Sequence, residues 1–204
     1  MLKDAGVVSR FAPSPTGALH LGHAFSALRA HDLAREVGGR FLLRIEDIDP
    51  GRSREAFMAG IEADLRWLGL RWDGPVLRQS SRMDAYRQAL ERLGGAGLTY
   101  PCFCTRADIA AAASAPHGPE GPVYPGTCRA LPPAERVRRM GREPHCRRLD
   151  MARAVEFAGP LTWEDETAGT VAADPLRFGD VVLARKETPT STISPSPSTT
   201  PGRG

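Results

Sequence analysis

The segment from Arg10 to His23 constrains the fold of this 204-residue chain more than any other part of it. It reads Arg-Phe-Ala-Pro-Ser-Pro-Thr-Gly-Ala-Leu-His-Leu-Gly-His. A short apolar strand over Val7 to Phe11 is predicted to enter a loop rich in proline and glycine, which ends where an amphipathic helix begins. A strand, a tight turn and a helix N-terminus form an anion-binding site, because main-chain N–H groups and the helix dipole point at the ligand.

Two glycines and two histidines give this loop its chemistry. Gly17 and Gly22 allow the backbone to approach a bound group closely, and the imidazoles of His20 and His23 can donate hydrogen bonds to phosphate oxygens. The combination indicates a triphosphate held beside an activating centre. The His-x-Gly-His pattern alone is weak evidence, because paired histidines near helix starts are often caps or packed rings.

A second apolar strand, from Phe41, stops in a run of acidic residues. The segment reads Phe-Leu-Leu-Arg-Ile-Glu-Asp-Ile-Asp and ends at Asp49. Ligands of open α/β sheets bind outside the carboxyl ends of the strands. We therefore expect Glu46, Asp47 and Asp49 to face the same crevice as the two histidines. A solvated acidic turn is the alternative, and it suits Asp49 better than Glu46.

Helical periodicity follows each of these segments. Three apolar stripes are predicted to be helix faces in the core, comprising Ala24, Ala27, Leu28 and His31, then Phe57, Ile61, Leu65 and Leu68, then Met83, Tyr86, Leu90 and Leu93. The second helix is expected to end at Gly69, and the third to start at Ser80 or Ser81 and stop at Gly94. Alternating strands and helices of these lengths predict a βαβ unit with parallel strands.

The cysteines predict a second site. Cys102 and Cys104 form a Cys-x-Cys pair on a short extended segment, and Cys128 follows a loop rich in glycine and proline. Such a pair can grip one metal ion, and later ligands can complete a tetrahedral zinc site. Spacing alone leaves the fourth ligand open among Cys146, His117, His145 and Tyr124. Incidental reduced cysteines are the alternative, and a disulfide framework is not expected in a cytoplasmic chain with so few cysteines.

The first two motifs together resemble the ATP-binding signature and the Arg-Ile-Glu-Asp strand of class I aminoacyl-tRNA synthetases, in the form used by glutamyl enzymes. The resemblance implies a Rossmann-like nucleotide fold, with His20 and His23 as catalytic residues. It implies an ATP site at Pro13, Gly17, His20, Gly22 and His23, with Mg²⁺ accompanying ATP. It also implies a glutamate site at Arg10, Phe11, Ala12, Pro13, Ser14 and Glu46, in which Glu46 takes the α-ammonium group.

The cysteine region is similar to that of short glutamyl-synthetase paralogues that act on queuosine-bearing tRNA(Asp). Their Cys-x-Cys…Tyr-x-x-x-Cys zinc site is matched by Cys102, Cys104, Tyr124 and Cys128, whereas Cys146 lies outside the pattern. The match continues to the segment Phe-Gly-Asp-Val-Val-Leu-Ala-Arg-Lys, which begins at Phe178. It implies that L-glutamate is activated by ATP and then transferred to queuosine in the anticodon of tRNA(Asp).

Composition limits the alternatives. The net charge of +3 permits a nucleic-acid partner without demanding one. No apolar run approaches the roughly 20 residues that a membrane span needs, and the N-terminus lacks the apolar segment of a signal peptide. We expect a cytoplasmic monomer with no membrane partner.

The C-terminus departs from the family pattern. After about residue 190 the sequence turns into a Ser/Thr/Pro-rich tail, a composition that predicts disorder. We expect three regions: residues 1–100 as the first, incomplete half of the nucleotide fold, residues 101–190 as a zinc-containing insert with an acceptor-binding-like region, and residues 191–204 as a disordered tail. The abrupt change predicts a frameshift or truncation, with impaired activity, because Lys186 belongs to a different motif from the family's catalytic lysine loop.

Two alternatives to the queuosine-tRNA synthetase remain open at this stage. The chain can be a fragment of an ordinary glutamyl-tRNA synthetase, although the compact insert argues against that identity. It can also be a non-catalytic, zinc-binding remnant.

Overall fold

The computed structural model describes residues 6–105, 107–109, 117–118, 121–165 and 167–186. The predicted disordered tail lies outside this part of the chain. The structure divides into two compact units, residues 1–83 and residues 84–204. The first predicted region ends at residue 100 and thus extends beyond the first unit; the three predicted regions stay a prediction.

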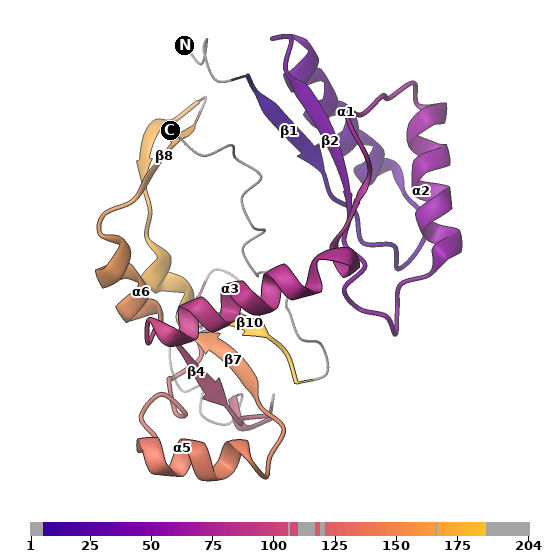
Figure 1. The fold of residues 1–204 in the computed structure, drawn as a ribbon. Coiled ribbons are helices and arrows are strands. Elements are labelled where there is room, and N and C mark those ends of the chain that lie inside the picture. Colours follow the sequence, from indigo (N-terminus) through magenta and orange to yellow (C-terminus); the bar gives the residue numbers. More distant parts are fainter. Residues whose placement is uncertain (1–5, 106, 110–116, 119–120, 166, 187–204) are drawn as a thin grey trace. The chain divides into compact units, whose positions relative to one another are not determined.

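The first unit is built around a parallel sheet (Figure 1). Its order is β1-β2-β3, with β1 at Val8–Phe11, β2 at Arg40–Ile45 and β3 at Leu77–Arg78. Helix α1 (Leu21–Arg35) connects β1 to β2, and α2 (Glu55–Trp67) lies between β2 and β3. The predicted βαβ unit is therefore confirmed, because β1 and β2 pair in parallel register from Val8 opposite Arg40.

One hydrophobic core joins the sheet and both helices of this unit. Its buried side chains include Phe41, Leu43 and Ile45 of β2 and Ile61 and Leu65 of α2. Gly39 lies in the turn before β2, where the backbone passes close to Val7. A Cβ atom at this position would lie 2.3 Å from the carbonyl oxygen of Val7, so a glycine is required there. The predicted apolar stripes reach the core only in part: Ala27 of the first stripe and Ile61 and Leu65 of the second are buried. The other members, Ala24, Leu28, His31, Phe57 and Leu68, are only partly buried.

A short 3₁₀ helix (η1, Gln79–Arg82) follows β3 and leads into α3 (Met83–Gly95), whose residues from Asp84 onward belong to the second unit. The predicted start and stop of this helix are confirmed to within a few residues. Its apolar stripe is less buried than we expected, because Tyr86 is its buried residue whereas Leu90 and Leu93 are intermediate.

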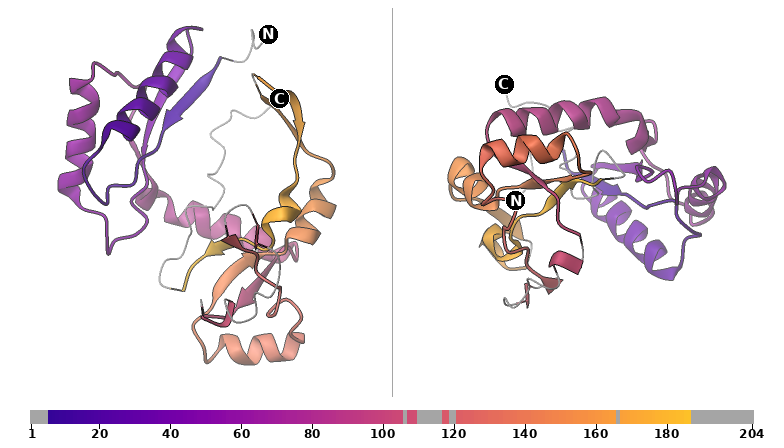
Figure 2. Two further views of the ribbon diagram at one scale, coloured as in Figure 1. Left: turned by 180° about the vertical axis from the view of Figure 1, so that it is seen from behind. Right: turned by 90° about the horizontal axis from the view of Figure 1, so that it is seen from below.

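The second unit contains an antiparallel sheet of order β10-β7-β4 (Figures 1 and 2). These strands are β4 (Thr99–Cys102), β7 (Cys146–Leu149) and β10 (Val182–Ala184). The other elements are two hairpins, β5 (His117–Gly118) with β6 (Gly121–Pro122) and β8 (Thr162–Asp165) with β9 (Gly169–Ala172), the helices α5 (Pro133–Met140) and α6 (Met151–Ala158), and the 3₁₀ helix η2 (Pro175–Phe178).

A separate core holds this sheet together. Tyr100, Cys102 and Cys146 lie in it with Tyr124 and Cys128 from the connection that follows β6. The three cysteine-bearing segments, which are separated in the sequence, thereby meet within one buried cluster. None of the helices in the described residues is long and apolar enough to cross a membrane.

Candidate functional site

A cavity of about 530 Å³ opens where β1 ends and α1 begins. It is lined by Arg10, Phe11, Ala12, Pro13, Ser14, Thr16, Gly17, Ala18, His23 and Ser26. Seven of these residues belong to the predicted ATP and glutamate sites, so the structure brings most of that set around one hollow. Thr16, Ala18 and Ser26 were not predicted, although Thr16 and Ala18 lie inside the signature and Ser26 follows it by one turn of α1.

His20 and His23 form a reciprocal cap at the start of α1. His20 is the N-cap residue, and its Nδ1 atom accepts a hydrogen bond from the main-chain N–H of Gly22 at 3.1 Å. The Nδ1 atom of His23 accepts from the main-chain N–H of His20 at 3.3 Å. The ring centroids lie 3.8 Å apart. The two histidines therefore do cap the helix, as paired histidines near helix starts often do. Capping uses only the Nδ1 atom of each ring.

These contacts fix the tautomer of both rings. A ring nitrogen that accepts from a main-chain N–H carries no proton, so the proton of each neutral imidazole lies on Nε2. Partial burial, followed by the proximity of His20, lowers the pKa of His23 below its ordinary value of 6.5. The neutral, Nε2–H form of His23 is thus favoured at neutral pH, and this is a form that donates a hydrogen bond to an anion.

The three acidic residues after β2 do not act as one group. Glu46 is partly buried, and one of its carboxylate oxygens accepts from Arg44 at 2.5 Å. The carboxylate of Asp47 is buried and accepts from the main-chain N–H and the hydroxyl group of Ser80. The prediction that Asp47 faces the crevice is wrong, because its carboxylate joins the end of β2 to η1.

Asp49 lies in a turn. Its carboxylate accepts from the main-chain N–H of Gly51 and from the side chain of Arg52. The hydrogen bond from Arg52 is the main reason why the pKa of Asp49 is lowered. The alternative of a solvated acidic turn therefore describes Asp49. His20, Gly22 and Glu46 are not among the residues that line the cavity, so their predicted ligand contacts stay predictions.

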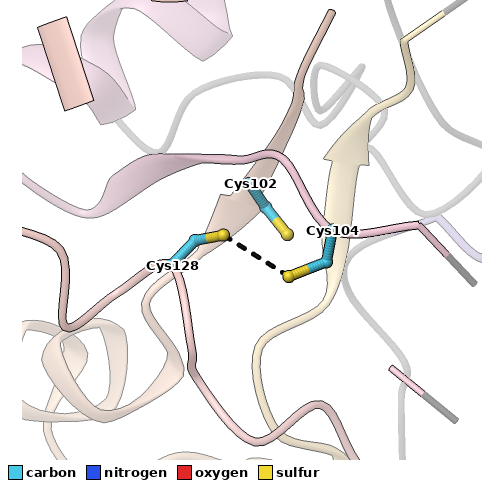
Figure 3. Close-up of side chains that lie close together, drawn as sticks. All are labelled: Cys102, Cys104 and Cys128. Carbon is cyan, nitrogen blue, oxygen red and sulfur yellow. Dashed lines mark hydrogen bonds between the residues drawn. The ribbon is translucent and has the colours of Figure 1, made fainter. Parts of the chain in front are cut away.

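The second site is a thiol cluster in which three sulfur atoms point toward one another (Figure 3). The sulfur atoms of Cys102, Cys104 and Cys128 all lie within 4.8 Å of one another, and those of Cys104 and Cys128 are 3.5 Å apart. The hydroxyl oxygen of Tyr124 lies 3.4 Å from the sulfur of Cys102 and 3.6 Å from that of Cys104. The four residues of the predicted zinc site are therefore gathered in one place.

The distances suit a tetrahedral metal ion. With metal–sulfur bonds of about 2.3 Å, two thiolates of one tetrahedron lie about 3.8 Å apart, and an oxygen ligand lies about 3.5 Å from each sulfur. Main-chain donors support the site, since the N–H of Phe103 donates to the sulfur of Cys128 and the N–H of Cys128 donates to the oxygen of Tyr124. The cluster can hold a metal ion without rearrangement of the chain.

Cys146 lies beside this cluster. It stands opposite Cys102 in the β4–β7 register and is buried. Its thiol is the main reason why the pKa of Cys102 is lowered to about 4, with Tyr124 and Arg148 adding to the effect. Burial raises the pKa of Cys104 to about 11. Within this cluster the surroundings of Cys102 therefore favour the thiolate form, whereas those of Cys104 and Cys146 favour the thiol.

The histidines considered as fourth ligands take other places or cannot be assessed. The ring of His145 packs beside Phe103, with centroids 5.6 Å apart, and its Nδ1 atom lies 3.2 Å from the carbonyl oxygen of Glu143. The side chain of His117 lies outside the described part of the structure. Tyr124 is thus the candidate whose observed position suits the fourth ligand.

Asp180 and Arg148 are buried residues whose burial the sequence did not predict, since Arg147 and Arg148 are expected from their charge to lie on a solvated helix face and instead belong to strand β7. Asp180 accepts hydrogen bonds from the hydroxyl group of Tyr100 at 2.5 Å and from the main-chain N–H of Met151 at 2.9 Å. This carboxylate and burial raise the pKa of Tyr100, burial being the larger cause. The available signal was an acidic residue, Asp180, shortly before the apolar strand β10.

Comparisons with known proteins give consistent matches. A family model described as the catalytic domain of class I tRNA synthetases (E and Q) matches residues 6–192. A protein of Rhodobacter capsulatus named glutamyl-Q tRNA(Asp) synthetase is 50% identical over 91% of this chain and 69% of its own length. One of the same name from Symbiobacterium thermophilum is 48% identical over 87% of this chain and 57% of its own length. This chain thus spans only part of the length of these two relatives.

A solved structure shows the same fold. The glutamate tRNA ligase of Elizabethkingia meningosepticum, in complex with its amino acid, superposes with a TM-score of 0.72 at 27% identity. The superposition covers 93% of this chain and 40% of the ligase. The similarity therefore extends through both units of the described structure.

Proposed function

This chain belongs to the class I tRNA synthetases of the glutamate and glutamine group, and on that premise we propose that its first unit binds ATP with Mg²⁺ and L-glutamate and activates the glutamate. The observation that carries the proposal is the cavity at the start of α1, which is lined by Arg10, Ser14, Gly17 and His23. Main-chain N–H groups and imidazole N–H groups at a helix start suit a phosphate chain.

The chain's own residues account for the proposed chemistry as follows. The Nε2–H groups of His20 and His23, held in one tautomer by the cap, donate to the phosphate oxygens as charge develops during attack at the α-phosphorus. Donors fixed in place before the reaction stabilise a transition state without reorganisation. Arg10 binds the negatively charged part of the glutamate substrate. Glu46, which Arg44 orients, binds the α-ammonium group of that substrate.

The proposed acceptor is queuosine in the anticodon of tRNA(Asp). The names of the relatives from Rhodobacter and Symbiobacterium support this choice, because both are glutamyl-Q tRNA(Asp) synthetases at 48–50% identity. The glutamate tRNA ligase is only 27% identical. The ordinary glutamyl-tRNA synthetase is the second candidate, and the similarity of fold with that ligase is what favours it. A cytoplasmic monomer suits either function.

We further propose that Cys102, Cys104, Tyr124 and Cys128 hold a structural zinc ion. Their distances suit a tetrahedral site, and three thiolates are ligands that zinc favours. When bound, the ion would tie the segment after β4 to the turn that contains Cys128. No catalytic step is assigned to it.

Calorimetry on the 204-residue chain tests the amino-acid assignment. Glutamate is expected to bind more tightly than glutamine or aspartate, because a wrong ligand leaves buried polar groups unpaired. Glu46→Gln should weaken glutamate binding, whereas Asp49→Asn, a matched change in the neighbouring turn, should not. Equal binding of glutamine, or indifference to Glu46→Gln, would reject the assignment.

A chimera tests the acceptor. Residues 1–190 joined to the remaining sequence of the Rhodobacter relative should charge tRNA(Asp) that carries queuosine and should leave tRNA(Glu) uncharged. The same tRNA(Asp) without queuosine is the control. Charging of tRNA(Glu) would instead support the ordinary synthetase.

A further inference from the structure

Arg148 on β7 is a buried cation. Its exposed fraction is 8%. One guanidinium N–H group donates to the main-chain oxygen of Asp180 at 2.7 Å, and the Nε atom has no hydrogen-bond partner within the described part of the chain. No carboxylate of the described residues forms an ion pair with it, and the carboxylate of Asp180 is engaged by Arg129, Tyr100 and Met151. A buried charge without a counter-ion destabilises the fold, so we expect a negatively charged group other than a carboxylate beside Arg148.

The thiol cluster is the neighbour that Arg148 faces. The guanidinium carbon lies 3.9 Å from the centroid of the Tyr124 ring. In the β4–β7 register Tyr100 stands opposite Arg148 and Cys102 stands opposite Cys146, so Arg148 is the diagonal neighbour of Cys102 on the same face of the sheet. Arg148 is therefore in contact with one predicted thiolate ligand and stacked on the predicted oxygen ligand.

The net charge of the metal site explains the position of Arg148. A zinc ion carries two positive charges, and three thiolates carry three negative ones, so the site with a neutral phenol has a net charge of about −1. This site is buried, since Cys102, Tyr124 and Cys128 are each less than a tenth exposed. The buried guanidinium group of Arg148 at its edge offsets this negative charge, as does the ammonium group of Lys186, which donates to the main-chain oxygen of Phe103 at 3.0 Å.

We infer that Arg148 is the outer positioning residue of the metal site: its charge balances the metal–thiolate group, and its guanidinium plane holds the ring of Tyr124 so that the hydroxyl group points at the ion. The inference rests on the proposed zinc site. Residues that orient metal ligands from outside typically affect metal affinity by 10- to 100-fold.

Zinc competition with a chromophoric chelator tests this role in the full 204-residue chain. Arg148→Met, which keeps most of the side-chain length and removes the charge, should weaken zinc binding about 10-fold or more. Arg148→Lys should lose less, because it keeps the charge but not the planar stack. Arg147→Met is the matched control, because Arg147 is partly exposed and lies on the other face of β7. The zinc affinity of this variant should equal that of the wild type.

A second measurement separates positioning from general support of the fold. In zinc-free protein, Arg148→Met loses one main-chain hydrogen bond but also removes the cost of burying a guanidinium group, so its stability to urea should stay close to that of Arg147→Met. The absorption of the cobalt-substituted variant should also shift, because the Tyr124 ligand moves. Wild-type zinc affinity in both Arg148→Met and Arg148→Lys overturns the inference while leaving the zinc site intact. A wild-type chain that binds no zinc overturns both.

Discussion

Asp47 holds Ser80 with both of its carboxylate oxygens, one accepting from the main-chain N–H at 2.9 Å and the other from the hydroxyl group at 2.6 Å. The two residues are 33 positions apart, and the carboxylate is buried. This link fixes the segment after β2 against the start of η1. Glu46, one residue earlier, is the carboxylate that we assign to the ligand.

Asp47→Ala should therefore affect stability and not specificity. Each of the two hydrogen bonds that are lost is worth about 0.5–1.5 kcal/mol of unfolding free energy, and water can reach the exposed Ser80 in the variant. Urea denaturation should show this loss, and calorimetry should show the same preference for glutamate over glutamine as in the wild type. A lost preference with unchanged stability would instead place Asp47 in the ligand site.

Two variants of His20 separate its capping role from its proposed role in binding phosphate. His20→Ala removes the cap of α1 and should lower the stability of the first unit by about 1 kcal/mol, whereas His20→Asn retains a capping side chain and should cost less. Both remove the imidazole N–H donor, so both should weaken the binding of pyrophosphate, measured by calorimetry. Full pyrophosphate affinity in His20→Asn would leave His20 as a cap only.

The titration of His23 should reflect its surroundings. Its pKa is expected to lie below 6.5, and in His20→Asn it should rise toward that value because the neighbouring positive charge is removed while partial burial remains. Since the folded pKa is lowered, the unfolded chain binds more protons at mildly acidic pH, and this group's contribution to stability is present above pH 6.5 and is lost as the pH falls. NMR titration of the ring protons measures the shift. A pKa above 6.5 in the wild type would contradict this account.

Local patterns predicted the parts of the fold that depend on neighbours in the sequence. The strand ending at Phe11, the turn and the helix starting at Leu21 follow from alternation, glycine and periodicity within about 25 residues. Seven of the cavity residues were expected because that same segment resembles the family's ATP-binding signature, which contains all seven.

Contacts between distant segments could not be predicted in this way. The link from Asp47 to Ser80 depends on β3, a strand of only two residues that carries no periodic signal. The place of Cys146 beside Cys102 depends on the register of β4 with β7, and a shift of one residue would turn Arg148 and Cys146 to the opposite face. Register is set by packing over the whole unit, which one sequence does not display.

Three thiols, and not the neighbouring Cys146, are expected to bind the metal ion. The reduced wild-type chain should contain about one zinc per molecule, and Cys104→Ser should lower this content because it removes one of three thiolate ligands. Cys146→Ser, the matched change, should leave the zinc content unchanged. The reason is that the hydroxyl oxygen of Tyr124 already lies where a fourth ligand would, at a suitable spacing from the sulfur atoms of Cys102 and Cys104. Metal analysis after gel filtration gives the content. Equal losses in the two variants, with none in Tyr124→Phe, would make Cys146 the fourth ligand in place of Tyr124.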